Sequence, residues 1–210
     1  MLQLVAEPNN KVINSPANIY DFREAFLKKM PLEISSYVER TAGEGSSHKG
    51  NISAYSRFSL IPSVLKGISE IDTKITILGR EISSPVLIAP SAWHNLFHVD
   101  GEKATSSATE RFNSIFCISS FSSQGFDEIR GESERNLSHT WLQLLIHKDK
   151  EVMIELIRAA KKSGCSAIVL TVDAPNGCRM CRSKSSQTTQ FGIPPALMPL
   201  LPQYKNLLSN

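Results

Sequence analysis

The stretch AIVLTVDAP, residues 167–175, decides the predicted fold of this chain. It is a short apolar, β-rich run that ends in Thr171, Asp173 and Pro175. In a β/α barrel the C-terminal ends of the strands carry the chemistry, so a hydroxyl and a carboxylate there are placed to act on a ligand. A buried strand that ends in a turn aspartate explains the same residues, but three further strand ends favour the barrel.

Apolar strands alternate with helical segments upstream of this stretch. We expect strands at 86–89, 115–118, 141–145 and 168–172, and helices near 100–111, 126–130 and 150–162. This alternation predicts parallel βα units in an α/β fold, and the continuous apolar strands predict burial on both faces. Four such units predict the N-terminal half of an eight-stranded TIM barrel, because a complete barrel takes about 250 residues.

Short helices precede the predicted half-barrel. Asp21 is expected to cap a first helix, and Pro31 to open a second one that contains Tyr37. Residues 41–49 are rich in Gly and Ser and predict a loop, whereas residues 75–78 predict a β element. No fifth strand is evident after Asp173. The predicted organisation is an N-terminal arm, one partial barrel domain and a Pro-rich tail, at residues 1–18, 19–195 and 196–210.

The composition fits one globular domain and excludes several classes of function. The chain has 210 residues, of which 41% are hydrophobic, and a formal net charge of +3. No basic run indicates nucleic-acid binding, and no apolar stretch approaches the length of a membrane span. The N-terminus lacks the basic region of a signal peptide. We expect an intracellular protein, cytoplasmic rather than peroxisomal, because Leu208-Ser209-Asn210 is not a peroxisomal address.

The cysteines also favour a reduced compartment, since four are few for a disulfide scaffold of this length. Cys178 and Cys181 have the spacing of a zinc half-site or a redox dithiol. Cys117 and Cys165 are not spaced as the second pair that a zinc site needs. We therefore expect two free thiols in a loop and no metal site.

The four strand ends carry small or neutral hydrogen-bonding groups. They are the Pro90-Ser91-Ala92 turn, Ser119 with Ser120, Gln143 and Thr171. A carboxamide and hydroxyls match the alternating donors and acceptors of a flat heterocycle. They do not match a metal ion, which would need clustered carboxylates, His or Cys.

An ordered series of motifs resembles one family, the FMN-dependent 2-hydroxy-acid oxidases and dehydrogenases. The matching segments are NISAYSR at 51–57, PVLIAPSA at 85–92, ISSFS at 118–122, WLQL at 141–144 and LTVDAP at 170–175. The resemblance extends from about residue 18 to residue 195. It implies an FMN cofactor at the mouth of the barrel. The residues implied to hold FMN are the backbone of Pro90, Ser91 and Ala92 and the side chains of Ser119, Gln143 and Thr171.

The resemblance also implies oxidation of a small L-2-hydroxy acid to the 2-oxo acid. Tyr37 and Arg179 would bind the substrate, and Asp173 would orient a catalytic His. That His and the phosphate site belong to the second half of the family's domain, which we expect this chain to lack. A second Tyr of the family is replaced here by Leu145. The chain alone is therefore expected to be weakly active or inactive.

The alternative is a non-catalytic half-barrel that acts through protein–protein association. Leu145 and the altered loop at Arg179 favour a loss of catalysis, whereas Tyr37, Gln143 and Asp173 favour a retained flavin site. A half-barrel exposes strand edges and apolar faces. Both alternatives therefore predict self-association, as a homo-oligomer or by pairing with a complementary half-barrel.

Overall fold

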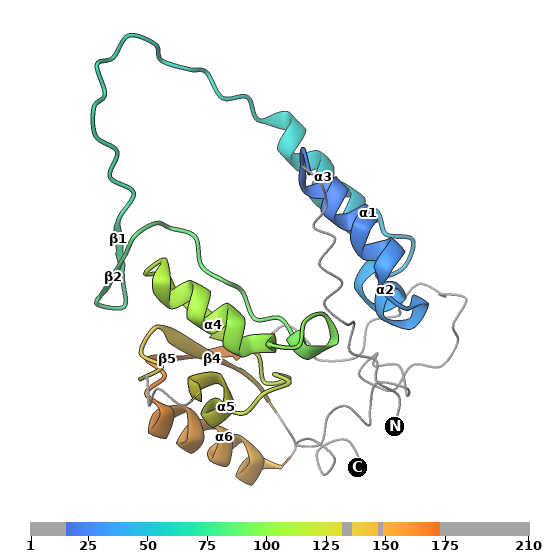
Figure 1. The fold of residues 1–210 in the computed structure, drawn as a ribbon, viewed down its shortest axis with the longest axis vertical. Helices are drawn as coiled ribbons and strands as arrows, with labels where there is room; N and C mark the ends of the chain where they lie inside the picture. Colours follow the sequence, from blue (N-terminus) through green and yellow to red (C-terminus); the bar gives the residue numbers. More distant parts are fainter. Residues whose placement is uncertain (1–15, 132–135, 147–148, 173–210) are drawn as a thin grey trace. The chain divides into compact units, whose positions relative to one another are not determined.

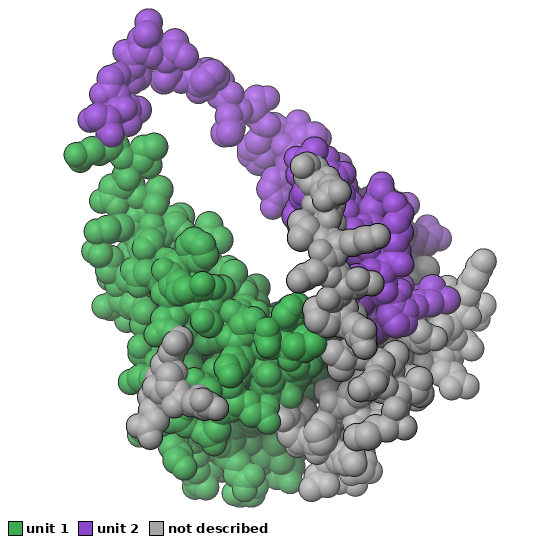
Figure 2. All heavy atoms as spheres, viewed as in Figure 1, with its two compact units in different colours: residues 1–7, 70–175 green, residues 8–69, 176–210 purple. Residues whose placement is uncertain are grey.

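The computed structural model describes residues 16–131, 136–146 and 149–172, which fall into two compact units (Figure 2). One unit holds residues 16–69, and the other holds the described residues from 70 to 172. The domain limits predicted at residues 18 and 195 stay predictions.

The unit of residues 16–69 is helical (Figure 1). Its elements are α1 (Ile19–Lys29), α2 (Leu32–Glu39), α3 (Ser46–Ala54) and the 3₁₀ turn η1 (Tyr55–Arg57). The prediction that Asp21 caps α1 is wrong. Asn18 is the cap, because its side chain accepts the backbone N–H of Tyr20 at 2.8 Å. Asp21 completes the capping box by accepting the backbone N–H of Asn18 at 3.3 Å. α2 begins directly after Pro31, as predicted.

α3 overturns the loop predicted for residues 41–49, since the chain is helical from Ser46. Gly45 adopts a left-handed conformation with φ +76° and sets the start of the helix. The backbone N–H of Lys49 then donates to the carbonyl of Gly45 at 2.9 Å. A high Gly and Ser content therefore marks the helix boundary here rather than a continuous loop.

A β-hairpin opens the second unit. β1 (Ile75–Ile77) pairs antiparallel with β2 (Arg80–Ile82), and Ile75 lies opposite Ile82. Leu78 and Gly79 connect them with φ values of +48° and +78°. Two central residues with positive φ are typical of the type I′ turn, whose twist suits a two-residue hairpin. The β element predicted at 75–78 is confirmed, and its partner strand was not predicted.

Parallel strands form the sheet of the same unit. They are β3 (Phe116–Ile118), β4 (Thr140–Leu145) and β5 (Ala167–Thr171), adjacent in that order. The helices are α4 (Gly101–Arg111), α5 (Phe126–Arg130) and α6 (Lys150–Ser163), and they alternate with the strands along the chain (Figure 1). This alternation confirms the predicted βα units. The strands do not close into a barrel within the described residues.

The strand predicted at residues 86–89 is reduced to a single bridge, in which Ile88 pairs in parallel with Phe116. The N–H of Ile88 donates to the carbonyl of Ile115, and the N–H of Cys117 donates to the carbonyl of Ile88, both at 2.9 Å. Pro85 and Pro90 flank the segment and have no N–H to donate. The first βα unit therefore joins the sheet at one residue.

α6 shows how closely local sequence signals can fix a helix. The side chain of Asp149 accepts the backbone N–H of Glu151 at 2.9 Å and begins the helix. Gly164, at φ +88°, ends it in a left-handed cap. Both ends agree with the predicted helix over 150–162.

No helix in the described ranges is long and apolar enough to cross a membrane.

Buried apolar side chains tie β3 to α5. Phe116, Ile118, Ile129 and Leu137 form one cluster, and none is more than 4% exposed. Phe116 and Ile118 lie two residues apart and so face the same side of β3. Ile129 comes from α5, so the cluster holds the helix against the strand.

The thiol of Cys117 on β3 makes stability sensitive to alkaline pH. Burial, and secondarily the neighbouring Cys165, raises the pKa of Cys117 from 9.0 to about 11. Below pH 9 the thiol is protonated in both the folded and the unfolded chain. Between pH 9 and about 11 only the unfolded chain ionises, so we expect the free energy of unfolding to fall by about 2 kcal/mol over this window.

Urea unfolding at pH 8 to 11 in reducing buffer, followed by tryptophan fluorescence, measures this loss. Both tryptophans, Trp93 and Trp141, belong to the unit that contains Cys117. Cys117→Ala is the control, because it removes only the thiol while every other group still titrates. An identical pH dependence in the two chains would contradict the prediction.

Candidate functional site

Polar side chains form a network at the C-terminal edge of the β3–β4–β5 sheet. The carboxamide of Gln143 lies at its centre. Its Oε1 accepts the backbone N–H of Ser120 at 3.0 Å and the hydroxyl of Ser119 at 3.3 Å. Its Nε2 donates to the hydroxyl oxygen of Thr171 at 2.7 Å. We call Ser119, Ser120, Gln143 and Thr171 the strand-end network.

The parallel arrangement of the strands brings these residues together. Ser119 and Ser120 directly follow β3, Gln143 lies near the end of β4, and Thr171 ends β5. The hydroxyl of Ser120 also donates to the backbone carbonyl of Gln143 at 2.6 Å, which links the end of β3 to β4. The two serines and Gln143 are all buried, so these internal hydrogen bonds satisfy groups that would otherwise be costly to bury.

The network retains donors for a ligand. A carboxamide has two N–H donors, and a hydroxyl has one O–H donor besides its lone pairs. The second Nε2 hydrogen of Gln143 and the hydroxyl hydrogen of Thr171 have no protein acceptor among the described residues. Because the Ser120 N–H fixes which end of the carboxamide is oxygen, the amide donor has a defined position, whereas the Thr171 hydroxyl can rotate toward a ligand. The arrangement can hydrogen-bond the acceptor atoms of a flat polar ring.

The structure brings together three of the predicted site residues, Ser119, Gln143 and Thr171. Ser120, which the sequence analysis grouped with Ser119 at a strand end but did not assign to FMN, also belongs to the network. The Pro90-Ser91-Ala92 turn lies in the loop after the Ile88 bridge. Asp173 and Arg179 lie outside the described residues, as does the Cys178–Cys181 pair.

Tyr37 lies on α2, in the unit of residues 16–69. Its ring is half-buried, and burial raises the pKa of its hydroxyl above 10.0. The guanidinium of Arg40 lies 5.4 Å from the ring centroid. The role of Tyr37 in substrate binding stays a prediction.

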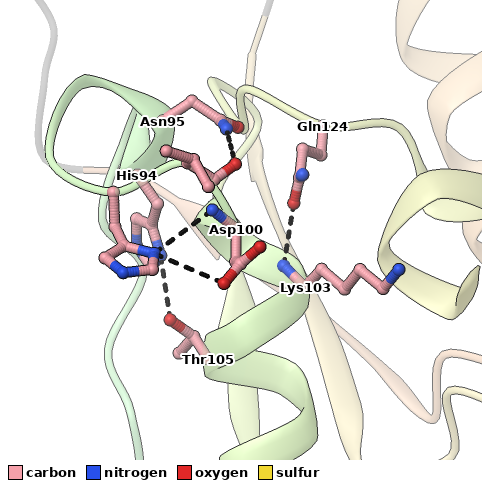
Figure 3. A network of polar contacts seen from close by, with 8 residues as sticks. His94, Asn95, Asp100, Lys103, Thr105 and Gln124 are labelled. Carbon is pink, nitrogen blue, oxygen red and sulfur yellow. Dashed lines mark hydrogen bonds and ion pairs between the residues drawn. The ribbon is translucent and has the colours of Figure 1, made fainter. Parts of the chain in front are cut away.

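Polar contacts hold the segment after Trp93 against α4 (Figure 3). The Nδ1 of His94 lies 3.1 Å from the hydroxyl of Thr105, and the amide of Asn95 donates to the carbonyl of Val99 at 2.7 Å. The backbone N–H of Lys103 donates to the side chain of Gln124 at 2.8 Å.

Within the part of the chain that the structure describes, no three His, Cys, Asp or Glu side chains gather as metal ligands.

The start of α4 requires glycine at position 101 for two reasons: its backbone has a positive φ, and a neighbouring side chain leaves no room for a Cβ atom. Its φ is +45°, and a Cβ there would lie 2.4 Å from Oδ1 of Asn95. Relief of this clash would break the hydrogen bond from Asn95 to Val99. We expect Gly101→Ala to lower the free energy of unfolding by about 1–3 kcal/mol, measured by tryptophan fluorescence in urea.

The double variant Asn95→Ala, Gly101→Ala separates the two causes. Removal of the Asn95 side chain relieves the clash but leaves the strained backbone. We expect Gly101→Ala to cost less in the Asn95→Ala background than in the unsubstituted chain. An equal cost in both backgrounds would show that the close approach to Asn95 contributes nothing.

Comparisons with known proteins agree on one family. The family model described as FMN-dependent dehydrogenase matches residues 27–206. Glycolate oxidase 1 of Oryza sativa subsp. indica is 33% identical over 180 residues, which cover 86% of this chain and 47% of the relative. Human 2-hydroxyacid oxidase 1 is also 33% identical over 180 residues, covering 85% of this chain and 47% of its own length. The chain thus spans about half the length of the curated relatives it matches.

Solved structures show the same partial coverage. Mandelate oxidase with (S)-4-hydroxymandelic acid matches with a TM-score of 0.72 at 30% identity, over 83% of this chain and 48% of that chain. A lactate oxidase of Pediococcus acidilactici matches with a TM-score of 0.73 at 24% identity, over 93% of this chain and 54% of that chain. These likenesses confirm the predicted fold class, an α/β half-barrel preceded by short helices.

Proposed function

The chain belongs to the family of FMN-dependent dehydrogenases, and from this premise we propose that it supplies part of a site that oxidises a 2-hydroxy acid with FMN. The strand-end network carries the proposal. It lies at the carboxyl ends of parallel strands, where barrel enzymes place their active sites. The names of the relatives, glycolate oxidase and 2-hydroxyacid oxidase, support the substrate class.

The residues of the network fit a flavin ring. The ring edge of FMN carries carbonyl oxygens and ring nitrogens that accept hydrogen bonds, and an N–H that donates one. The second amide hydrogen of Gln143 and the hydroxyl hydrogen of Thr171 are suitable donors, and the hydroxyl oxygens are suitable acceptors. The network contains no ionised side chain, so it would bind a neutral ring without burying an unpaired charge.

When bound, FMN supplies the chemistry of two-electron oxidation, and the protein supplies binding and orientation. We propose that Ser119, Gln143 and Thr171 hold the ring edge, and that the Pro90–Ala92 backbone lies along it. Tyr37 and Arg179 would bind the substrate carboxylate. Asp173 would hold the protonated form of a catalytic His, because a carboxylate stabilises an imidazolium. The structure gives His94 and His139 other partners, Thr105 and Ser106.

A second candidate is non-catalytic association with another protein chain. Two side chains of β5, Ile168 and Leu170, are 43% and 52% exposed, although β5 is part of the sheet. Exposed apolar strand faces favour association. Leu145 also supports this candidate, since its side chain offers no hydrogen bond to a substrate.

An anaerobic titration of the purified 210-residue chain with FMN tests the proposal. We expect the visible bands of FMN to shift and its fluorescence to change as it binds, because the strand-end network replaces water at the ring edge. Glycolate or L-lactate is then added to the complex. We expect little or no bleaching by this chain alone, since the resemblance implies that the catalytic His belongs to the second half of the family's domain, and the chain spans about half the length of its relatives.

Each outcome decides between the candidates. A free-FMN spectrum at every protein concentration would overturn flavin binding by this chain and favour the association candidate. Bleaching by the hydroxy acid would show that the chain carries out the reductive half of the reaction and that a base acts within it. Light scattering on the same sample measures association independently of the flavin.

A further inference from the structure

We propose that Glu102 is a positioning residue that holds the two loops facing the proposed FMN site, an inference that rests on the proposed function. Glu102 lies in the first turn of α4, and its side chain is 0% exposed. Glutamates are almost never fully buried unless they are paired. The partners of Glu102 are backbone groups of two different loops.

One carboxylate oxygen joins these loops. The Oε1 atom of Glu102 accepts the backbone N–H of His94 at 3.1 Å and the backbone N–H of Ser123 at 2.8 Å. His94 follows the loop of residues 89–93, and Ser123 lies in the loop of residues 119–125 between β3 and α5. Removal of the carboxylate would leave two N–H groups without this acceptor, at a cost in stability for each.

The two loops also contact each other directly. The backbone N–H of Trp93 donates to the carbonyl of Phe121, and the backbone N–H of Asn95 donates to the hydroxyl of Ser123, both at 3.1 Å. Gln143 holds the second loop near its start at Ser120, and Glu102 holds it three residues further along at Ser123. A shift of Ser123 would therefore reach Ser119 and Ser120 through a segment of only a few residues.

The role depends on the acceptor oxygen. The second oxygen, Oε2, has no hydrogen-bond partner within the described part of the chain. The positive end of the α4 dipole favours the carboxylate in the first turn. Glutamine would keep an acceptor in the position of Oε1, whereas alanine would remove it. The two variants therefore separate loss of the contact from loss of the charge.

Amide hydrogen exchange, measured by NMR on the full chain without FMN, tests the positioning role. In Glu102→Ala we expect the His94 and Ser123 amides to exchange about a hundredfold faster, since each loses its acceptor. In Glu102→Gln we expect at most about a tenfold change at the same amides. The control is Glu110→Ala, which removes the same charge from an exposed position of α4.

The dissociation constant of FMN is the second readout. We expect it to rise about tenfold in Glu102→Ala, to rise less in Glu102→Gln and to be unchanged in Glu110→Ala. Unchanged exchange at both amides in folded Glu102→Ala would overturn the positioning role. If Glu102→Ala does not fold, Glu102→Asp replaces it, because the shorter side chain withdraws the acceptor: faster exchange of both amides in folded Glu102→Asp supports the role, and unchanged exchange overturns it.

The two proposals fail in different ways. If no form of the chain binds FMN, the proposed function is wrong for this chain. The exchange rates at His94 and Ser123 still decide whether Glu102 holds the loops, because they are measured without the flavin.

Discussion

Gln143→Leu is expected to weaken FMN binding at least tenfold and to lower the free energy of unfolding by about 2–4 kcal/mol. Leucine fills a similar volume but has no polar atoms. The backbone N–H of Ser120 would lose its acceptor, and Thr171 would lose the donor that contacts it at 2.7 Å. The hydrogen bond from the Ser120 hydroxyl to the backbone carbonyl of residue 143 would remain. FMN fluorescence titration and urea unfolding measure the two effects.

Gln143→Glu separates ligand binding from stability. The glutamate keeps an oxygen for the Ser120 N–H, and the Thr171 hydroxyl can rotate to donate to its other oxygen. Burial of the charge costs stability, but the Ser120 N–H and the Thr171 hydroxyl offset part of that cost, so we expect a loss no greater than in Gln143→Leu. FMN binding should still fall at least tenfold, because the carboxylate has no N–H for the ring. Normal FMN affinity in Gln143→Glu would show that residue 143 supports the loop and does not contact the flavin.

The sequence predicts those parts of the fold that depend on local signals. The helix predicted over 150–162 agrees with α6 to within one residue because Gly164 marks its end in the sequence, and the structure adds Asp149 as its N-cap. α3 was missed because its Ser- and Gly-rich segment resembles a loop in composition. The strand at 86–89 was overpredicted for a different reason. Apolar residues there suggest a full strand, but pairing is a tertiary property, and only Ile88 forms a bridge.

The sequence predicts which residues form the site but not the hydrogen bonds that orient them. Ser119, Gln143 and Thr171 were found because parallel strands place their ends at one edge. The hydrogen bonds that orient the Gln143 carboxamide were not predictable, since they depend on the exact register of β4 and β5. Glu102 was missed for a related reason. A Glu in the first turn of a helix is usually a solvated residue that favours the helix dipole, and the sequence gives no sign of its complete burial.

Phe116→Ala is expected to produce the largest loss of stability, about 3–5 kcal/mol. The Phe116 ring is 0% exposed and packs in the cluster with Ile118, Ile129 and Leu137. Alanine would leave a cavity between β3 and α5 that a short strand cannot collapse to fill. Since domains are typically stable by only about 5–15 kcal/mol, much of the unit should unfold at low urea concentration. Tryptophan fluorescence in urea measures the change.

Phe112→Ala is the matched control, because Phe112 is 77% exposed at the end of α4. The same truncation there should change stability by no more than about 0.5 kcal/mol. Equal losses in the two variants, or a loss below about 1 kcal/mol in Phe116→Ala, would contradict the assigned core.

Stabilisation by FMN can be compared between Phe116→Ala and Gln143→Leu. A ligand that binds only the folded state stabilises the protein in proportion to the logarithm of its concentration. At a free concentration of about 100 times the dissociation constant, it adds about 2.7 kcal/mol to the free energy of unfolding. Phe116 lies in the core and outside the strand-end network, so FMN at that excess should restore much of the stability of Phe116→Ala. The FMN concentration that rescues Phe116→Ala should give less stabilisation in Gln143→Leu, whose affinity is reduced. If FMN stabilises both variants equally, then Gln143 does not bind the flavin, whatever its effect on the fold.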